Sequence, residues 1–555
     1  MALEHQALSK RQSTIRYNWG FRFAIWCALL WGFSFQGIGM LFDGSSFLAS
    51  AQVATNPLIM GAMVALFISI LVALIAFIWM VLGGSFAEWR YAICRFNRLN
   101  LLYLLCATLG GGATVASIII ANLLGVTFAV GMVIFYPVIG ALIANLWYNE
   151  KISRRALCGL LVIVAGCACL YVPDMLAFLT DADKHPPLPV GNLPSGGLST
   201  QALAFHDPSA TSPISLIAPV ARNGNPLLIC CLGVLVGIGW GAESALASRA
   251  MDFTNARVGV SIRFTYEAII MVLICLVCVL FLKSSLPLVS TWTTILTHSR
   301  TLLLMAIIAL CLVLNYFSWY QSLLFCGVCR GTAVSDISGF VTVVLGMLLM
   351  LSNPSLLTIV ACMLMLLGVY LVYCGQSANL SVLRNVDLMP IEKPLKLLGN
   401  PPVLGVKSLA LGLIATNGGA WDQELLAYMK GACHANAPSS ALAPSAAASA
   451  LLLAASAPPA ATPAPPAATP APPAATPAPP AATPAPPAAP PSTHHKKLRH
   501  NLQLALIELT AAGLIVAVDD TLDKQAGDHQ ETLHVRYQLT GFGQTRLKQL
   551  LWLDA

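Results

Sequence analysis

Two acidic residues, Glu243 and Glu267, stand inside long apolar segments of this 555-residue chain. An ionisable group at the centre of a bilayer costs at least about 2.5 kcal/mol and usually marks a functional pathway. A carboxylate that takes up a proton in such a place can couple transport to protons. The alternative is that each forms a structural ion pair with Arg249 or Arg263, which lie near the same membrane level.

Polar and aromatic residues gather in the apolar segment 302–324, on faces set by helical spacing. Such a surface can stack against an organic substrate and hydrogen-bond it. The alternative is an aromatic belt at the membrane interface, but Asn315 lies in the middle of the segment, which a belt does not explain. The predicted substrate-binding residues are Asn315, Tyr316, Trp319, Tyr320, Tyr136 and Trp240.

Motifs for catalysis or nucleotide binding are absent from the sequence. It contains no Gly-x-Ser-x-Gly, no His-Glu-x-x-His and no Walker-type phosphate loop. Gly110-Gly111-Gly112 fits no such loop and predicts close helix packing. One Cys-x-x-Cys, Cys326 to Cys329, has no second pair, so helix-end packing explains it better than zinc. We expect no enzyme activity, no cofactor, no metal and no ATP-driven pumping.

The composition requires elements that place these residues in a membrane. Apolar residues make up 57% of the chain and charged residues 10%, whereas soluble domains carry about 25% charged residues. A spanning helix needs about 20 mostly apolar residues. The predicted fold is an all-α polytopic membrane protein with ten transmembrane helices, over 21–41, 57–82, 101–122, 127–148, 156–176, 227–247, 264–282, 302–324, 335–351 and 356–374.

Lys and Arg residues in the short loops predict the orientation. Fourteen of them, with Arg263 counted as a loop residue, fall on one side and four on the other. Both termini are therefore expected to be cytoplasmic. A signal peptide cleaved near Ala49-Ser50-Ala51 is the alternative to the first span, but its apolar run is longer than usual.

A shift of 202 residues superposes the second half of the chain on the first. Segments 101–122 and 156–176 then fall close to 303–324 and 358–378. Five spans per copy is an odd number, so the second copy would be inverted in the membrane. Inverted repeats are typical of secondary transporters. Chance alignment of Leu- and Gly-rich spans is the alternative.

The most specific motif runs over residues 136–171. It joins a span that begins Tyr136-Pro137, a turn Glu150-Lys151-Ile152-Ser153 and a span punctuated by Gly159 and Gly166. It resembles the end of an EamA-type repeat of the drug/metabolite transporter superfamily, and the resemblance covers residues 20–375. The resemblance implies ten helices, five plus five, with cytoplasmic termini. The second copy departs from it, because residues 351–355 lack the Glu. Glu150 itself is expected to be a solvated cap.

The composition changes again in the C-terminal part. From Pro458 the unit Pro-Pro-Ala-Ala-Thr-Pro-Ala occurs four times, which predicts a semi-rigid spacer. Residues 494–555 show a helix, two strands and a last helix capped by Thr540. Together with helices expected over 403–416 and 419–433, they resemble a small α+β winged-helix domain. Few basic residues and no base-reading pattern accompany it, so protein contact is at least as good a reading as DNA binding.

These observations predict a secondary transporter of the bacterial inner membrane that moves a small organic metabolite or drug in exchange for protons. Its expected partners are that substrate, protons and the lipid bilayer, with a homodimer and nucleic acid contact through the tail left open. The alternative is a membrane-anchored ligand sensor that signals through the tail. The predicted divisions are an N-terminus, a five-helix repeat, an extracytoplasmic loop, a second five-helix repeat, a tail segment, a spacer and a winged-helix-like domain, over 1–20, 21–176, 177–226, 227–375, 376–442, 443–493 and 494–555.

Overall fold

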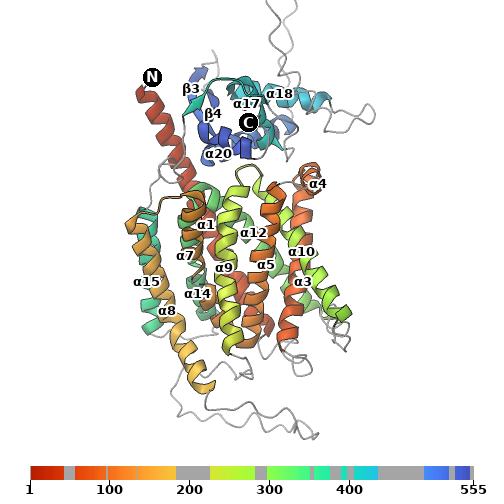
Figure 1. Cartoon of the computed structure of the whole chain (residues 1–555), viewed down its shortest axis with the longest axis vertical. Coiled ribbons are helices and arrows are strands. Elements are labelled where there is room, and N and C mark those ends of the chain that lie inside the picture. Colours follow the sequence, from red (N-terminus) through yellow and green to blue (C-terminus); the bar gives the residue numbers. More distant parts are fainter. Residues whose placement is uncertain are drawn as a thin grey trace, which may run out of the picture.

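A computed structural model shows a helical body with a smaller α/β domain at one end (Figure 1). The residues that the structure describes are 2–42, 57–94, 98–124, 126–133, 135–182, 226–281, 297–349, 356–375, 389–396, 405–435, 493–523 and 532–549. The predicted loop 177–226 and spacer 443–493 lie mostly outside them.

Seven stretches of helix in the described part are long and apolar enough to cross a membrane. Many of their large apolar side chains are exposed on the outside of the body, as a lipid-facing surface requires. The chain is thus a helical membrane-type protein, as predicted. The stretches lie in α1 (Ala2–Phe42), α3 (Pro57–Leu82), α5 (Arg98–Leu124), α9 (Pro226–Ala250), α10 (Ala256–Phe281), α12 (Ser299–Cys326) and the pair α13 (Val328–Ser335) and α14 (Ser338–Leu348).

The described body contains five further helices: α4 (Phe86–Cys94), α6 (Val126–Val133), α7 (Tyr136–Tyr148), α8 (Arg154–Ala182) and α15 (Leu356–Gly375). Two regions of the body consist of a pair of helices in place of one continuous helix. The segment 127–148 is split into α6 and α7, where Pro137 has no N–H to continue the helical ladder. The segment 335–351 was predicted to begin too late: it contains α14, whereas α13 begins at Val328 and ends at its C-cap Asp336, just before α14.

The start of α10 differs from the prediction. This helix begins at Ala256 rather than at residue 264, so Arg263 lies two turns inside it. Arg263 is also fully buried. Its assignment to a loop was wrong, because ion pairs with the neighbouring carboxylates, rather than contact with water, stabilise its charge.

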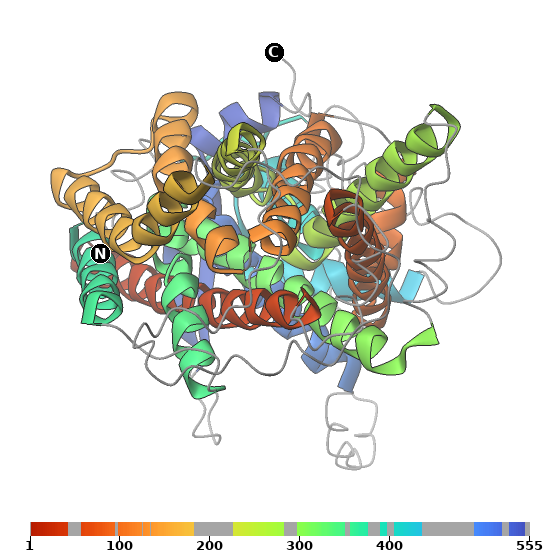
Figure 2. The ribbon, with the colours of Figure 1, turned by 90° about the horizontal axis from the view of Figure 1, so that it is seen from below.

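Helices α8 and α15 pack together at one edge of the body, far apart in sequence but adjacent in space (Figure 2). Two glycines face each other at their crossing. A Cβ added at Gly159 would lie 2.6 Å from the Gly368 carbonyl oxygen, and one added at Gly368 would lie 2.7 Å from that of Gly159. Small residues at such a crossing let two backbones approach closely.

The C-terminal domain is built around a two-stranded antiparallel ribbon, β3 (Ile515–Asp523) and β4 (Thr532–Thr540), paired from Ile515↔Leu539 to Asp523↔Thr532. Strand β4 also pairs with two short strands, β1 (Pro390–Ile391) and β2 (Ala420–Trp421). The helices that complete it are α17 (Val406–Asn417), α18 (Asp422–Ala435), α20 (Thr493–Ala511) and α21 (Gly541–Gln549).

Thr540 begins α21 as predicted. Its side-chain oxygen accepts a hydrogen bond from the Gly543 N–H, 2.9 Å away, which is an N-cap. Helices also occur in the two expected segments before the spacer, as α17 and α18. The domain, here called the tail domain, covers the end of the body at which the α9–α10 connection lies (Figure 1). We call this end the tail side.

The α8–α15 crossing leads to a stability prediction. Replacing Gly368 by Ala places a methyl group against backbone, so the helices must separate, which costs about 1–3 kcal/mol. Thermal unfolding in detergent should show a lower Tm for Gly368→Ala. Gly237→Ala is the matched control, since its Cβ would meet only ordinary contacts at 3.5 Å or more. Equal Tm values for the two variants would contradict the close crossing.

Candidate functional site

A buried arginine lies at the centre of the body. Arg263 on α10 is paired with two carboxylates, and none of the three side chains is more than 2% exposed. Its Nε lies 2.9 Å from Glu243 Oε1 on α9. Its Nη1 donates to Glu267 Oε2, one helical turn further along α10. The structure therefore brings together both predicted carboxylates, and it is Arg263, not Arg249, that pairs with them.

Hydroxyl groups complete this network. Arg263 Nη2 donates to the Tyr316 hydroxyl over 3.1 Å, and the Tyr320 hydroxyl donates to Glu243 Oε1 over 2.8 Å. The Ser69 hydroxyl, on α3, donates to Glu267 Oε1 over 2.9 Å. Every charged group thus has several partners, as a buried ion needs.

The network carries two carboxylates for one guanidinium among its described members. If both are ionised, the cluster holds one unbalanced negative charge away from water, which is costly. A single proton on either carboxylate removes that charge. Interacting acids of this kind share their protons, so the site is best treated as one titrating pair.

Glycines on α5 make room for the network. A Cβ at Gly110 would collide with the Glu243 carboxylate, and one at Gly111 would lie 2.9 Å from Glu267 Cγ. Gly112 faces open space. The triple glycine therefore allows close packing as predicted, and two of its three members press against the carboxylates themselves.

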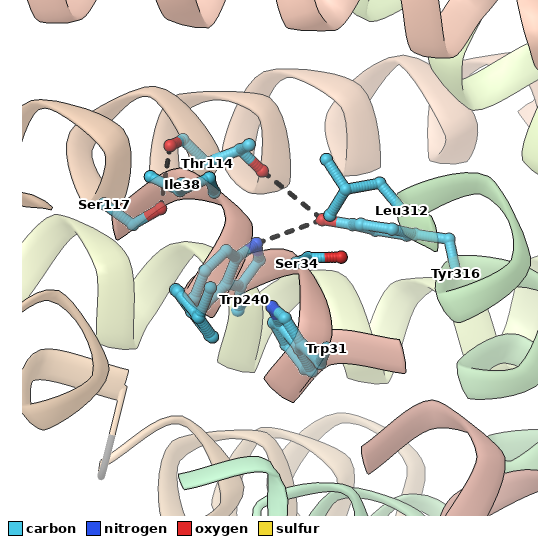
Figure 3. A pocket seen from close by; sticks show the side chains of 9 residues that line it. Trp31, Ser34, Ile38, Thr114, Ser117, Trp240, Leu312 and Tyr316 are labelled. Atoms are coloured by element: carbon cyan, nitrogen blue, oxygen red, sulfur yellow. Dashed lines mark hydrogen bonds between the residues drawn. The ribbon is translucent and has the colours of Figure 1, made fainter. Parts of the chain in front are cut away.

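A small pocket adjoins the network, with room for about one water molecule. Trp240 Nε1 donates to the Tyr316 hydroxyl over 3.1 Å, and this oxygen also lies 3.4 Å from the Thr114 hydroxyl (Figure 3). Tyr316 thus connects the pocket to Arg263. The pocket is lined by Trp31, Ser34, Phe35, Ile38, Thr114, Ser117, Trp240, Leu312 and Tyr316.

Trp31 on α1 links the remaining predicted residues. Its ring centroid lies 4.9 Å from that of Trp240, 5.6 Å from that of Tyr136 and 5.8 Å from that of Trp319. All six predicted substrate-binding residues are buried, and each lies in this aromatic cluster or beside it. An interface belt is therefore the wrong reading for them, because a belt places its rings at the surface of the body.

Two hydrogen-bond donors in this cluster have no partner among the described residues: Asn315 Nδ2 and Trp319 Nε1. They lie one helical turn apart on α12, and both side chains are 1% exposed. The Asn315 oxygen is occupied, since it accepts from the Cys27 thiol over 2.9 Å. Buried donors without partners are costly, so a bound acceptor would satisfy them.

Sequence reasoning missed several members of the site. Trp31 and Thr114 were not predicted as site residues, because an apolar segment does not show how two helices are rotated against each other. Asp336, buried where α13 ends, was overlooked although it stands within a predicted span. Arg263 was named as a possible ion-pair partner but counted as a loop residue, and its i,i+4 spacing to Glu267 favours the pairing that is observed.

The expectation for Glu150 was wrong. This residue is 2% exposed, because the chain turns inward after Asn149, which adopts a left-handed conformation with φ 56°. Glu150 Oε2 accepts from the Val328 N–H at the start of α13, 3.3 Å away. Its other oxygen lies 3.8 Å from Arg249 Nη2. It is a buried helix-terminus contact rather than a solvated cap.

No protein-family model and no curated protein matches the chain. Solved structures do match, among them one described as "Crystal structure of protein", which is 15% identical with a TM-score of 0.35. That match covers 62% of this chain and 95% of the other. A likeness of this size carries no argument about function, so the function must be argued from the site itself.

The glycine cradle gives a direct test of the network. Gly110→Ala should displace the Glu243 carboxylate from Arg263, because the new methyl group occupies its position. We expect a loss of about 1–3 kcal/mol of stability, measured as denaturant unfolding in detergent. Gly112→Ala, two residues further on the same helix, should leave stability within about 0.5 kcal/mol. The cradle is disproved if both variants behave alike.

Proposed function

We propose that this chain is a secondary transporter of a small organic metabolite or drug, coupled to protons, in a bacterial inner membrane with both termini in the cytoplasm. Ten spanning segments form two five-helix halves that expose the central cluster alternately to either side. The observation that carries the proposal is the buried Glu243–Arg263–Glu267 network beside an aromatic cluster.

The positions of the helices support two related halves. Helix α13 begins 202 residues after α6 (Val126 and Val328), and α15 begins 202 residues after α8 (Arg154 and Leu356). Helix α14 follows α7 by the same distance. The interrupted span therefore recurs at the same place in each half. Paired interrupted helices in corresponding positions commonly mark the binding site of a transporter.

The two interruptions also meet in space. The Tyr136 hydroxyl, where α7 begins, donates to the Thr332 carbonyl in α13 over 3.1 Å. The Tyr136 ring lies beside Trp31 and, with its centroid 6.2 Å away, beside Trp319. A flat organic substrate with a hydrogen-bond acceptor would bind here once the cluster widens, because aromatic rings lie near two donors that have no partner among the described residues.

Proton coupling follows from the charge count. One proton balances the two carboxylates against Arg263, and release of that proton restores an excess negative charge. Movement of the halves can therefore be tied to proton uptake on one side and release on the other. The small pocket corresponds to a closed arrangement of the cluster, which has to widen for substrate to enter.

A ligand sensor is the second candidate, and the contact between the tail domain and the body favours it. The order α17, β2, α18, α20, β3, β4, α21 supports the proposal of a winged-helix tail. In a sensor, ligand binding in the body would change how this tail engages a cytoplasmic partner. Binding of DNA by the intact chain, changed by a metabolite, would favour this candidate.

Single substitutions separate coupling from folding. Glu243→Gln or Glu267→Gln leaves one carboxylate for Arg263, so the protein should fold while exchange becomes independent of a pH gradient. Arg263→Gln leaves two buried carboxylates unpaired and should cost about 3–5 kcal/mol of stability. The dependence of exchange on the pH gradient is measured as uptake of a metabolite mixture into proteoliposomes, followed by mass spectrometry, with and without a pH gradient. The stability of Arg263→Gln is measured by denaturant unfolding in detergent.

The matched control is Glu392→Gln, which changes an exposed carboxylate of the tail domain in the same way. This variant should transport as the unaltered chain does. If no compound is taken up by the unaltered protein, or if its uptake ignores the pH gradient, the proton-coupled transporter is refuted and the sensor becomes the better account.

A further inference from the structure

The tail domain is joined to the body by a buried lysine. Lys407, on α17, is 3% exposed. Its ammonium group donates to the carbonyl oxygens of Met251 and Thr254, at 2.7 and 3.3 Å. Both carbonyls belong to the connection between α9 and α10. The same ammonium lies 3.2 Å from Glu508 Oε2 on α20. Three acceptors thus satisfy the charge, two of them in the body.

Further contacts extend this joint over the second half of the body. Glu508 Oε1 accepts from Gln321 Nε2, near the end of α12, over 3.0 Å. Arg546 of α21 lies 3.7 Å from Asp252, and its guanidinium is 5.4 Å from the Phe253 ring centroid. The tail domain therefore holds both the α9–α10 connection and α12.

The first half of the body is held as well. Strand β3 and helix α20 contact α1. Gly405, which precedes α17, lies so close to the Glu88 carboxylate of α4 that a Cβ there has no room. One domain thus contacts helices of both halves at the tail side.

We propose that the docked tail domain is an intramolecular lock that prevents the two halves from separating at the tail side. This inference rests on the proposed transport function, because rocking halves must separate at one side to admit substrate. The locked chain is closed at the tail side, and release of the tail domain permits opening there. The partner of the tail surface is thus the body of the same chain.

The energetics favour a switch rather than a permanent joint. The specific contacts named above are charges and hydrogen bonds that water can replace when the tail domain leaves, and buried apolar side chains of the tail domain and the body also form one continuous cluster. When the tail domain undocks, the polar groups exchange hydrogen bonds with the body for hydrogen bonds with water, which costs little net free energy. When it docks, water is excluded from the ion pair. A lock of this kind is released by anything that binds the tail domain better when it is undocked.

Glu88 makes the lock sensitive to pH. Burial raises the pKa of this carboxyl group from about 4.5 to about 8, with Lys407 lowering it and Glu508 raising it. Among the described residues, Lys407 of α17 and Glu508 of α20 are the charged groups that act on it, and the titratable phenol of Tyr103 on α5 interacts with it as well. Docking therefore takes up a proton between these two pH values. Through Glu88, docking is strongest at the acid end of this window and weakens by at most about tenfold per pH unit as the pH rises towards 8.

The lock is tested in the full chain with the double variant Gln321→Met, Arg546→Ala, which removes two contacts and keeps the tail's own core. Hydrogen exchange of residues 249–258 reports docking. Alkylation of the buried thiol of Cys329 by a charged maleimide reports opening at the tail side. We expect both rates to rise about tenfold, since each lost buried contact favours the open form.

Lys548→Ala is the matched control, because Lys548 is exposed on the same helix as Arg546. The exposed thiols of Cys94, Cys158 and Cys374 calibrate the reagent. Faster hydrogen exchange with unchanged Cys329 labelling overturns the lock, because the tail domain would then undock without opening the tail side. Unchanged hydrogen exchange overturns it as well, because these contacts would then not hold the tail domain. Neither readout uses a substrate, so an opened tail side without any transported compound would contradict only the transporter.

The pH arm uses Glu88→Gln, which imitates the protonated side chain. Hydrogen exchange of residues 249–258 in the unaltered chain should accelerate as the pH rises from 6 to 8, beyond the chemical effect seen in an unstructured peptide. In Glu88→Gln this extra acceleration should disappear. Its persistence would show that another group controls docking.

Discussion

The rest of the body is arranged around one constraint, the burial of the Arg263 guanidinium away from water. Such a charge is tolerated only with close counter-charges and further hydrogen bonds. Glu243, Glu267 and the hydroxyl of Tyr316 supply them. The α5 backbone must approach these side chains closely, and this approach needs glycine at position 110.

This network also joins the two halves of the chain. Arg263 and both carboxylates belong to the second half, on α9 and α10, whereas Gly110 and Ser69 belong to the first. A movement that separated the halves would uncover the carboxylates and lengthen the contact of Ser69 with Glu267. In the proposed transporter, solvation of the charges would then offset the lost contacts, which would link the protonation state of the pair to the position of the halves.

A second buried charge cluster, at the tail side, follows the same physics. Lys407 is satisfied by two backbone carbonyls and Glu508, and it also faces Glu88. Here too the carboxylates outnumber the cation in the described cluster, so a proton strengthens the closed arrangement. In the proposed transporter, the central cluster would open with the halves and the outer one with the tail domain. They are then two points at which protons would act on one movement.

The sequence alone determined the helical membrane character, the segments that become helices and the identity of the two central carboxylates. Each of these rests on composition or on local periodicity, which short-range physics sets. The sequence did not place Arg263 inside α10, because an arginine beside a predicted span reads as a loop residue until its counter-charges are known. The prediction of a solvated Glu150 was wrong for the same reason, since its turn looks exposed in the sequence until α13 packs against it.

The tertiary structure alone decided which faces meet. Trp31 joins Trp240, Tyr136 and Trp319 from four separate helices, and no pattern within one apolar helix specifies its rotation against another. The presence of α13 before Asp336 likewise appears only in three dimensions, whereas Pro137 already marks a break in the sequence. Lys407 reaches the carbonyls of Met251 and Thr254 over more than 150 residues of sequence. Contacts of such range depend on the packing of the whole chain, which local sequence preferences do not encode.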